Sequence, residues 1–160
     1  MKDFHPAVAE WFGAVFAEPT APQKRGWPAI ARGESTLILA PTGSGKTLTA
    51  YLWSLNRLMF EPAPRAEERC RVLYLSPLKA LAVDVERNLR SPLAGISNVA
   101  AGKNIPFLSP AIAVRTGDTP SAERAIPCTL RIISTDARRE KVMSRILRGS
   151  APATSRCATR

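Results

Sequence analysis

The chain has 160 residues, which is enough for one domain with a substantial buried core. Hydrophobic residues make up 45% of it, which excludes wholesale disorder, and no apolar run reaches the roughly 18 residues of a membrane span. Lysine and arginine outnumber aspartate and glutamate by 23 to 13, and the net charge of +10 favours a polyanionic partner such as nucleic acid. The three widely spaced cysteines fit no metal site, so we expect reduced thiols and a cytoplasmic protein.

Hydrophobic periodicity and turn residues predict an alternation of helices and strands. In chain order the predicted elements are helices over 5–17 and 23–31, a strand over 36–40, a helix over 46–59, a strand over 71–76, a helix over 78–90 and a strand over 111–115. Residues 61–69 are expected to form a surface loop, and residues 91–110, which carry several prolines and glycines, a long connection with at most a broken helix. This alternation predicts an α/β fold with a parallel sheet, and ligands at the carboxyl ends of its strands.

The stretch from Ala40 to Thr47 is typical of a phosphate-binding loop between a strand and a helix. Its glycines allow successive backbone N–H groups to point inward, and the start of the following helix adds further unpaired N–H groups. Lys46 would reach the β- and γ-phosphates, and the Thr47 hydroxyl would hold Mg²⁺. Ala40 stands where the usual pattern has its first glycine. The predicted nucleotide ligands are Thr42, Gly43, Ser44, Gly45, Lys46 and Thr47, of which the last two are the catalytic candidates.

Four stretches occur in an order that resembles a known family: 16–30, 40–47, 76–89 and 115–119. They are similar to the Q-motif region, motif I, motif Ia and the next nucleic-acid-binding motif of superfamily 2 helicases. The match is specifically to the large helicase-related (Lhr) group of DEAD/DEAH-type ATP-dependent DNA helicases. The resemblance covers roughly residues 10–125 and implies a P-loop, RecA-like, three-layer α/β fold.

The resemblance also implies ATP, with Mg²⁺, as the cofactor. Gln23 would select ATP, because its side-chain amide can both donate to and accept from the adenine base. Phe16 or Trp27 would flank the base, although either is equally well explained as a core residue.

The same resemblance assigns two turns to the phosphates of single-stranded or tailed duplex DNA, or of RNA. Hydroxyl, ammonium and N–H groups there would hold the nucleic-acid backbone without reading its sequence. The residues concerned are Ser76, Pro77, Lys79 and Ala80 after one strand, and Thr116 and Gly117 after another. Asp118 is read as a cap of the turn that follows.

Beyond Glu123 the resemblance stops. We expect a partial helicase domain over 1–125 and a basic tail unlike the family over 126–160, produced by a reading-frame shift near codon 125 rather than by evolution. Asp136 follows an apolar run, as a Mg²⁺-binding acid of the family would, but Ala137 replaces the expected glutamate. We therefore read Asp136 as a helix N-cap.

The sequence thus predicts the ATP-binding and nucleic-acid-binding N-terminal part of an ATP-dependent DNA helicase. The chain carries no Asp-Glu pair for the second acidic motif and no second domain, so we expect no ATP turnover by itself. Two alternatives remain open. One is a non-catalytic basic nucleic-acid-binding protein, and the other is a P-loop kinase-like nucleotide-binding protein.

Overall fold

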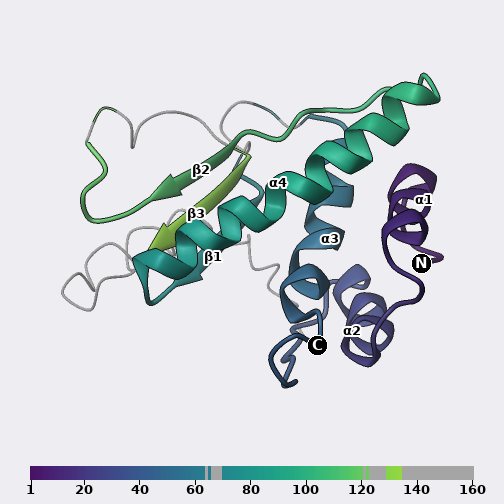
Figure 1. Ribbon diagram of the computed structural model, residues 1–160. Coiled ribbons are helices and arrows are strands. Elements are labelled where there is room, and N and C mark those ends of the chain that lie inside the picture. Colours follow the sequence, from purple (N-terminus) through teal and green to yellow (C-terminus); the bar gives the residue numbers. More distant parts are fainter. Residues whose placement is uncertain (64, 66–69, 121, 123–128, 135–160) are drawn as a thin grey trace, which may run out of the picture.

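The chain folds into four helices and a small sheet within the part that the computed structural model describes, residues 1–63, 65, 70–120, 122 and 129–134 (Figure 1). In chain order the elements are α1 (Pro6–Val15), α2 (Ala21–Ala31), α3 (Lys46–Phe60), β1 (Val72–Ser76), α4 (Lys79–Gly102), β2 (Ile112–Arg115) and β3 (Leu130–Ser134). The predicted order of elements from α1 to β2 is confirmed, except for the strand expected over 36–40 and for the length of α4.

The three strands form a parallel sheet in the order β1-β3-β2. Ser76 at the end of β1 pairs in register with Ser134 at the end of β3, so the carboxyl ends lie at one edge. The expected parallel α/β architecture is therefore confirmed. The central strand, β3, lies within the segment that we expected to be a tail unlike the family.

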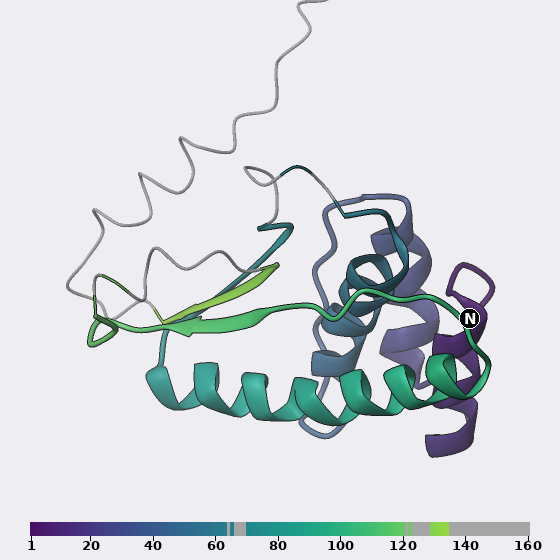
Figure 2. The same ribbon diagram turned by 90° about the horizontal axis from the view of Figure 1, so that it is seen from above.

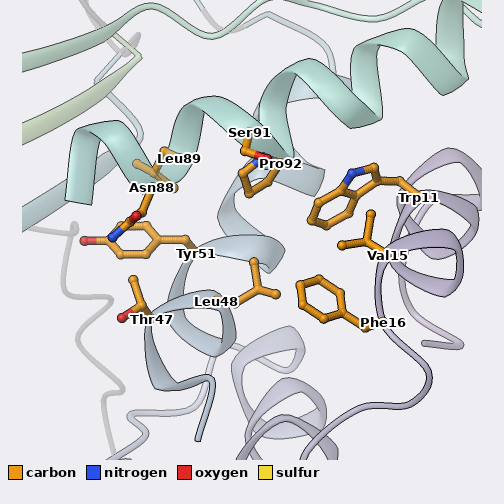
Figure 3. Close-up of a pocket in the computed structure, with 10 residues that line it drawn as sticks. All are labelled: Trp11, Val15, Phe16, Thr47, Leu48, Tyr51, Asn88, Leu89, Ser91 and Pro92. Atoms are coloured by element: carbon orange, nitrogen blue, oxygen red, sulfur yellow. The ribbon is translucent and has the colours of Figure 1, made fainter. Parts of the chain in front are cut away.

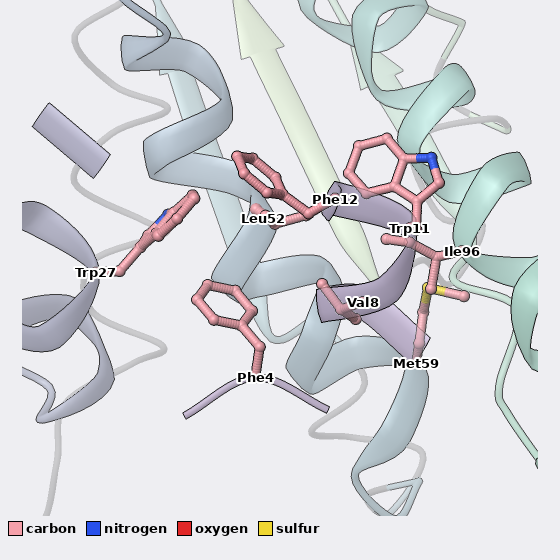
Figure 4. Packing of buried hydrophobic residues seen from close by; sticks show 8 residues of the cluster. All are labelled: Phe4, Val8, Trp11, Phe12, Trp27, Leu52, Met59 and Ile96. Carbon is pink, nitrogen blue, oxygen red and sulfur yellow. The ribbon is translucent and has the colours of Figure 1, made fainter. Parts of the chain in front are cut away.

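Helix α4 packs against both the sheet and the N-terminal helices. Figure 2 shows it running along one face of the sheet and continuing to α1. One buried cluster lies between α4, α3 and the sheet and includes Leu55, Val85, Leu130 and Ile132. The other joins α4 to the first three helices (Figure 4) and consists of Phe4, Val8, Trp11, Phe12, Trp27, Leu52, Met59 and Ile96.

The prediction of a strand over 36–40 is wrong. Residues 34–41 carry no regular secondary structure, and no described strand pairs with them. The side chains of Leu37 and Leu39 are 83% and 84% exposed, while Ile38 between them is half-buried. Exposed and half-buried side chains therefore alternate here as they do in a strand. A strand also needs a neighbouring strand to which it is hydrogen-bonded, and the local sequence does not determine whether one is present.

The expectation of a connection over 91–110 is also wrong in its first half, because α4 continues through Pro92 to Gly102. A proline inside a helix removes one backbone hydrogen bond and costs about 3 kcal/mol. Burial of Leu89, Ile96 and Ala100, each 2% exposed or less, outweighs that cost by extending the apolar stripe of the helix at helical spacing. Among the described residues, no helix is long and apolar enough to cross a membrane.

Candidate functional site

The loop before α3 has the backbone geometry of an anion cradle. Gly43 and Gly45 both adopt φ = +81°, a left-handed conformation that side chains other than glycine rarely adopt. Gly45 is the N-cap of α3, and the N–H of Ser44 donates to the carbonyl of Pro41 at 3.3 Å. The loop thus turns sharply into the N-terminus of a 15-residue helix, where unpaired N–H groups and the helix dipole favour negative charge.

Lys46 and Thr47 lie in the first turn of that helix. The Lys46 ammonium donates to the carbonyls of Ala40 and Pro41, the latter at 2.7 Å. The lysine side chain therefore folds back over the first residues of its own loop. The Thr47 side chain lies at the solvent-exposed start of the helix, where its hydroxyl is accessible to a ligand.

Helix α2 supports the loop through two polar side chains. Gln23 is only 3% exposed, and its Oε1 accepts the Thr20 N–H at 2.9 Å. Thr20 Oγ1 in turn donates to the carbonyl of Ser44 at 2.9 Å. A Cβ atom at Gly45 would lie 2.7 Å from Gln23 Nε2, so the amide packs directly against the loop. Sequence reasoning missed Thr20, although the spacing of Thr20 and Gln23 is that of a capping box.

The two aromatic residues expected near the base have different surroundings. Trp27 is buried, makes edge-on contacts with Phe4 and Phe12, and donates its Nε1–H to the carbonyl of Thr49 at 3.2 Å. It is therefore a core residue. Phe16 is 38% exposed and remains available to a ligand.

Phe16 lines a mostly apolar cavity of about 260 Å³ between α1, α3 and α4 (Figure 3). Thr47 lies at the same cavity, whereas Gln23 does not line it. Tyr51 forms part of the wall, and burial raises the pKa of its phenol, which stays protonated. The structure thus brings Phe16 and Thr47 to one cavity. Gln23 lies outside this cavity and packs against Gly45 of the loop.

The turn after β1 carries four of the predicted nucleic-acid contacts. Ser76 is buried, and its hydroxyl donates to the Leu78 carbonyl at 3.1 Å, so it stabilises the turn from inside. Pro77, Lys79 and Ala80 are exposed at the start of α4. Their exposure leaves them accessible to a ligand at the carboxyl edge of the sheet.

The turn after β2 carries the other two. The Thr116 N–H donates to Thr119 Oγ1 at 2.8 Å, and the Asp118 N–H donates to Thr116 Oγ1 at 3.3 Å. Gly117 is exposed between them. The Asp118 carboxylate forms an ion pair with Lys79, which joins this turn to the start of α4. Sequence reasoning missed this pair, because residues 39 positions apart give no local signal.

The chain matches a protein-family model described as "DEAD/DEAH box helicase" over residues 20–139. The chain belongs to this helicase family. The matched range includes the phosphate loop, both turns at the carboxyl edge and the central strand β3.

Individual relatives place the chain close to the Lhr group, and the predicted resemblance is confirmed. It is 53% identical over 121 residues to a Lhr helicase and probable uracil glycosylase of Mycolicibacterium smegmatis, covering 76% of this chain and 8% of the relative. It is 45% identical over 122 residues to the ATP-dependent helicase Lhr-Core of Methanothermobacter thermautotrophicus, covering 76% of this chain and 14% of the relative. The chain therefore spans only a small part of the length of these relatives.

A solved structure supports the same placement. The Mycobacterium smegmatis helicase Lhr bound to ssDNA and AMP-PNP superimposes with a TM-score of 0.74 at 48% identity, covering 82% of this chain and 17% of that one. The predicted RecA-like fold is thus confirmed.

The described residues offer little to a metal ion. Among the described residues, no three histidines, cysteines, aspartates or glutamates come together as a metal site. Asp136, the other residue considered for Mg²⁺, lies outside the described residues. The Thr47 hydroxyl is thus the candidate that the described part of the chain offers to a Mg²⁺ ion.

Proposed function

We propose that this chain is the part of an ATP-dependent helicase that binds Mg·ATP and single-stranded DNA, and that it does not turn over ATP by itself. The observation that carries the proposal is the geometry of the loop over 40–47, which ends at the N-terminus of α3 with two glycines at positive φ. The family match gives this loop its context. The ligands of the similar solved structure, ssDNA and AMP-PNP, support the choice of nucleotide and strand.

The residues of the loop fit a nucleoside triphosphate with Mg²⁺. In this proposal the N–H groups over 42–45 and the start of α3 hold the phosphate oxygens. Lys46 leaves the carbonyls of Ala40 and Pro41 and pairs with the phosphates, while the Thr47 hydroxyl binds Mg²⁺. The bound triphosphate supplies the bond whose hydrolysis powers a complete helicase. The residues of this chain supply binding and orientation.

We place the adenine base beside Phe16, since its exposed ring and Thr47 line the same cavity. The predicted contact between Gln23 and the base remains part of the proposal. Its Oε1 already accepts the Thr20 N–H, so the side-chain amide would offer the base its Nε2–H group. In the folded chain Gln23 supports the loop, and a contact with the base requires its amide, which is 3% exposed and does not line the cavity, to turn toward the base.

For DNA we assign the phosphate contacts to Lys79 and Ala80 after β1 and to Thr116 and Gly117 after β2. These residues lie on two turns at one edge of the sheet, and their donors do not depend on base identity. Ser76 takes an indirect part, because its buried hydroxyl shapes the first turn. Binding should then ignore base sequence and weaken steeply with salt.

The absence of turnover is proposed from the chemistry of phosphoryl transfer. The reaction needs an acid to hold Mg²⁺, a group to orient the attacking water and a cation opposite the γ-phosphate. The sequence contains no Asp-Glu pair that would supply the first two. Because such groups act as a unit, the residual rate should be close to background.

A single set of measurements tests the proposal. Fluorescence anisotropy of a labelled 20-nucleotide oligo(dT) would be followed with the 160-residue chain at several salt concentrations, with and without Mg·AMP-PNP. We expect binding that responds to the nucleotide and that weakens in Lys79→Ala, together with no DNA-stimulated ATP hydrolysis. Binding that ignores both the nucleotide and Lys79 would favour a basic protein that uses charge alone. ATP turnover that depends on Lys46 would contradict the absence of catalysis.

A further inference from the structure

An ion pair joins the two turns at the carboxyl edge of the sheet. Lys79, the first residue of α4, pairs with Asp118, which lies in the turn after β2. Their side chains are 44% and 79% exposed. Because β3 lies between β1 and β2, the pair spans the end of the central strand. A carboxylate thus faces an ammonium that the proposed function assigns to a phosphate.

The turn after β2 holds Asp118 in place for this contact. Thr119 donates its N–H to the carbonyl of Thr116 at 3.2 Å and accepts the Thr116 N–H through its hydroxyl at 2.8 Å. The Asp118 N–H donates to Thr116 Oγ1 at 3.3 Å. With the backbone fixed by these three bonds, the carboxylate is presented to Lys79 from a defined position.

We propose that Asp118 is an internal competitor, which occupies Lys79 until a backbone phosphate of single-stranded nucleic acid displaces it. The inference rests on the proposed function, because it needs Lys79 as a phosphate contact. It goes further by giving a role to an acidic residue that repels the ligand. The pair must open when the strand binds, and the affinity for the strand is reduced accordingly.

The strength of the pair suits such an exchange. Exposed ion pairs between lysine and a carboxylate change an equilibrium constant by a factor of about five at most. A nucleic-acid strand contacts several donors at once and releases counterions, so its binding is strong enough to open the ion pair. A single free anion makes only one such contact and does not open it. A ligand therefore needs several phosphate groups in contact with the protein before it displaces Asp118 from Lys79.

The test is a double-mutant cycle on the 160-residue chain, read by anisotropy of labelled 20-nucleotide oligo(dT) at low salt. Asp118→Asn keeps the shape of the side chain and removes its charge, and should tighten binding about two- to fivefold. Lys79→Ala should weaken binding. In the double variant the gain from Asp118→Asn should disappear, because the ammonium that it released is gone.

Glu10→Gln provides a matched control, because Glu10 forms an exposed pair with Lys103 at the opposite end of α4, about 35 Å from Lys79. This variant removes the same charge and should leave affinity unchanged. The inference is overturned if Asp118→Asn weakens binding or leaves it unchanged while Lys79→Ala still weakens it. It is also overturned if the gain persists without Lys79. If neither Lys79→Ala nor Asp118→Asn changes affinity, the nucleic-acid site itself is misplaced, and the proposed function fails with it.

Discussion

Thr20 Oγ1 donates a hydrogen bond of 2.9 Å to the carbonyl of Ser44, which joins the start of α2 to the phosphate loop. Since Gln23 caps the same helix and packs against Gly45, α2 supports the loop at two successive residues. The loop therefore depends on a helix that has no phosphate-binding motif of its own. Its conformation should respond to changes at Thr20 as well as to changes in the loop.

Thr20→Val tests this support, because valine keeps the shape of threonine and lacks the hydroxyl. One hydrogen bond contributes about 1 kcal/mol, so Mg·AMP-PNP affinity should fall about fivefold in a calorimetric titration. Thr36→Val is the matched control, since the Thr36 hydroxyl also donates to a backbone carbonyl, that of Glu34, but away from the loop. Equal affinities in the two variants would show that the Thr20 bond does not shape the loop.

The packing of α1 on α4 gives a second prediction. A Cβ atom on Gly95 would lie 2.1 Å from Trp11 Nε1, so any larger residue displaces the indole. Gly95→Ala should lower the free energy of unfolding by about 1–3 kcal/mol, measured with urea. Gly13→Ala, in α1, should raise it by about 0.5–1 kcal/mol, because nothing lies within 4 Å of the added methyl group there. A neutral Gly95→Ala would contradict the close contact.

These predictions concern contacts that could not be predicted from the sequence, whereas most of the helices and strands could. Helix α3 could be predicted because its apolar residues recur at helical spacing after a glycine-rich turn, and β1 because it is a short apolar run before a proline. The P-loop could be found because its function fixes residue types over a few positions. Signals of this kind are local.

Non-local features could not be predicted in the same way. Residues 36–40 have the alternation of a strand and yet no partner among the described strands, and pairing depends on segments far away in sequence. Strand β3 was expected to belong to a tail, because the family resemblance stops after Glu123, but its pairing with β1 and β2 places it at the centre of the sheet. Lys79 and Asp118 likewise meet only through the fold.

His5 makes the stability of α1 depend on pH. Its Nδ1 accepts the Ala7 N–H at 3.3 Å, and its ring stacks on Phe60 with centroids 3.7 Å apart. Burial lowers the pKa of the imidazole below 6.5, since the neutral form is preferred in the folded chain. The unfolded chain therefore binds the proton more readily, and this stabilisation is complete above about pH 6.5 and is lost as the pH falls through the lower, folded pKa.

His5→Asn tests this dependence, because asparagine can cap the helix and does not titrate. His5 is the single histidine of the chain. We expect the free energy of unfolding of the wild type to decrease between pH 7 and pH 5 relative to that of the variant, measured with urea at each pH. Parallel curves for the two proteins over this range would mean that the imidazole does not couple to folding.

The central claim is that the loop before α3 binds Mg·ATP, and Lys46 tests it most directly. Calorimetric titration with Mg·AMP-PNP would compare the wild type with Lys46→Ala and with Lys103→Ala, a control that removes an exposed lysine at the far end of α4. Circular dichroism would establish that all three proteins are folded. We predict that binding is largely lost in Lys46→Ala and unchanged in Lys103→Ala. Equal affinity in wild type and Lys46→Ala would contradict the assignment of the phosphate loop.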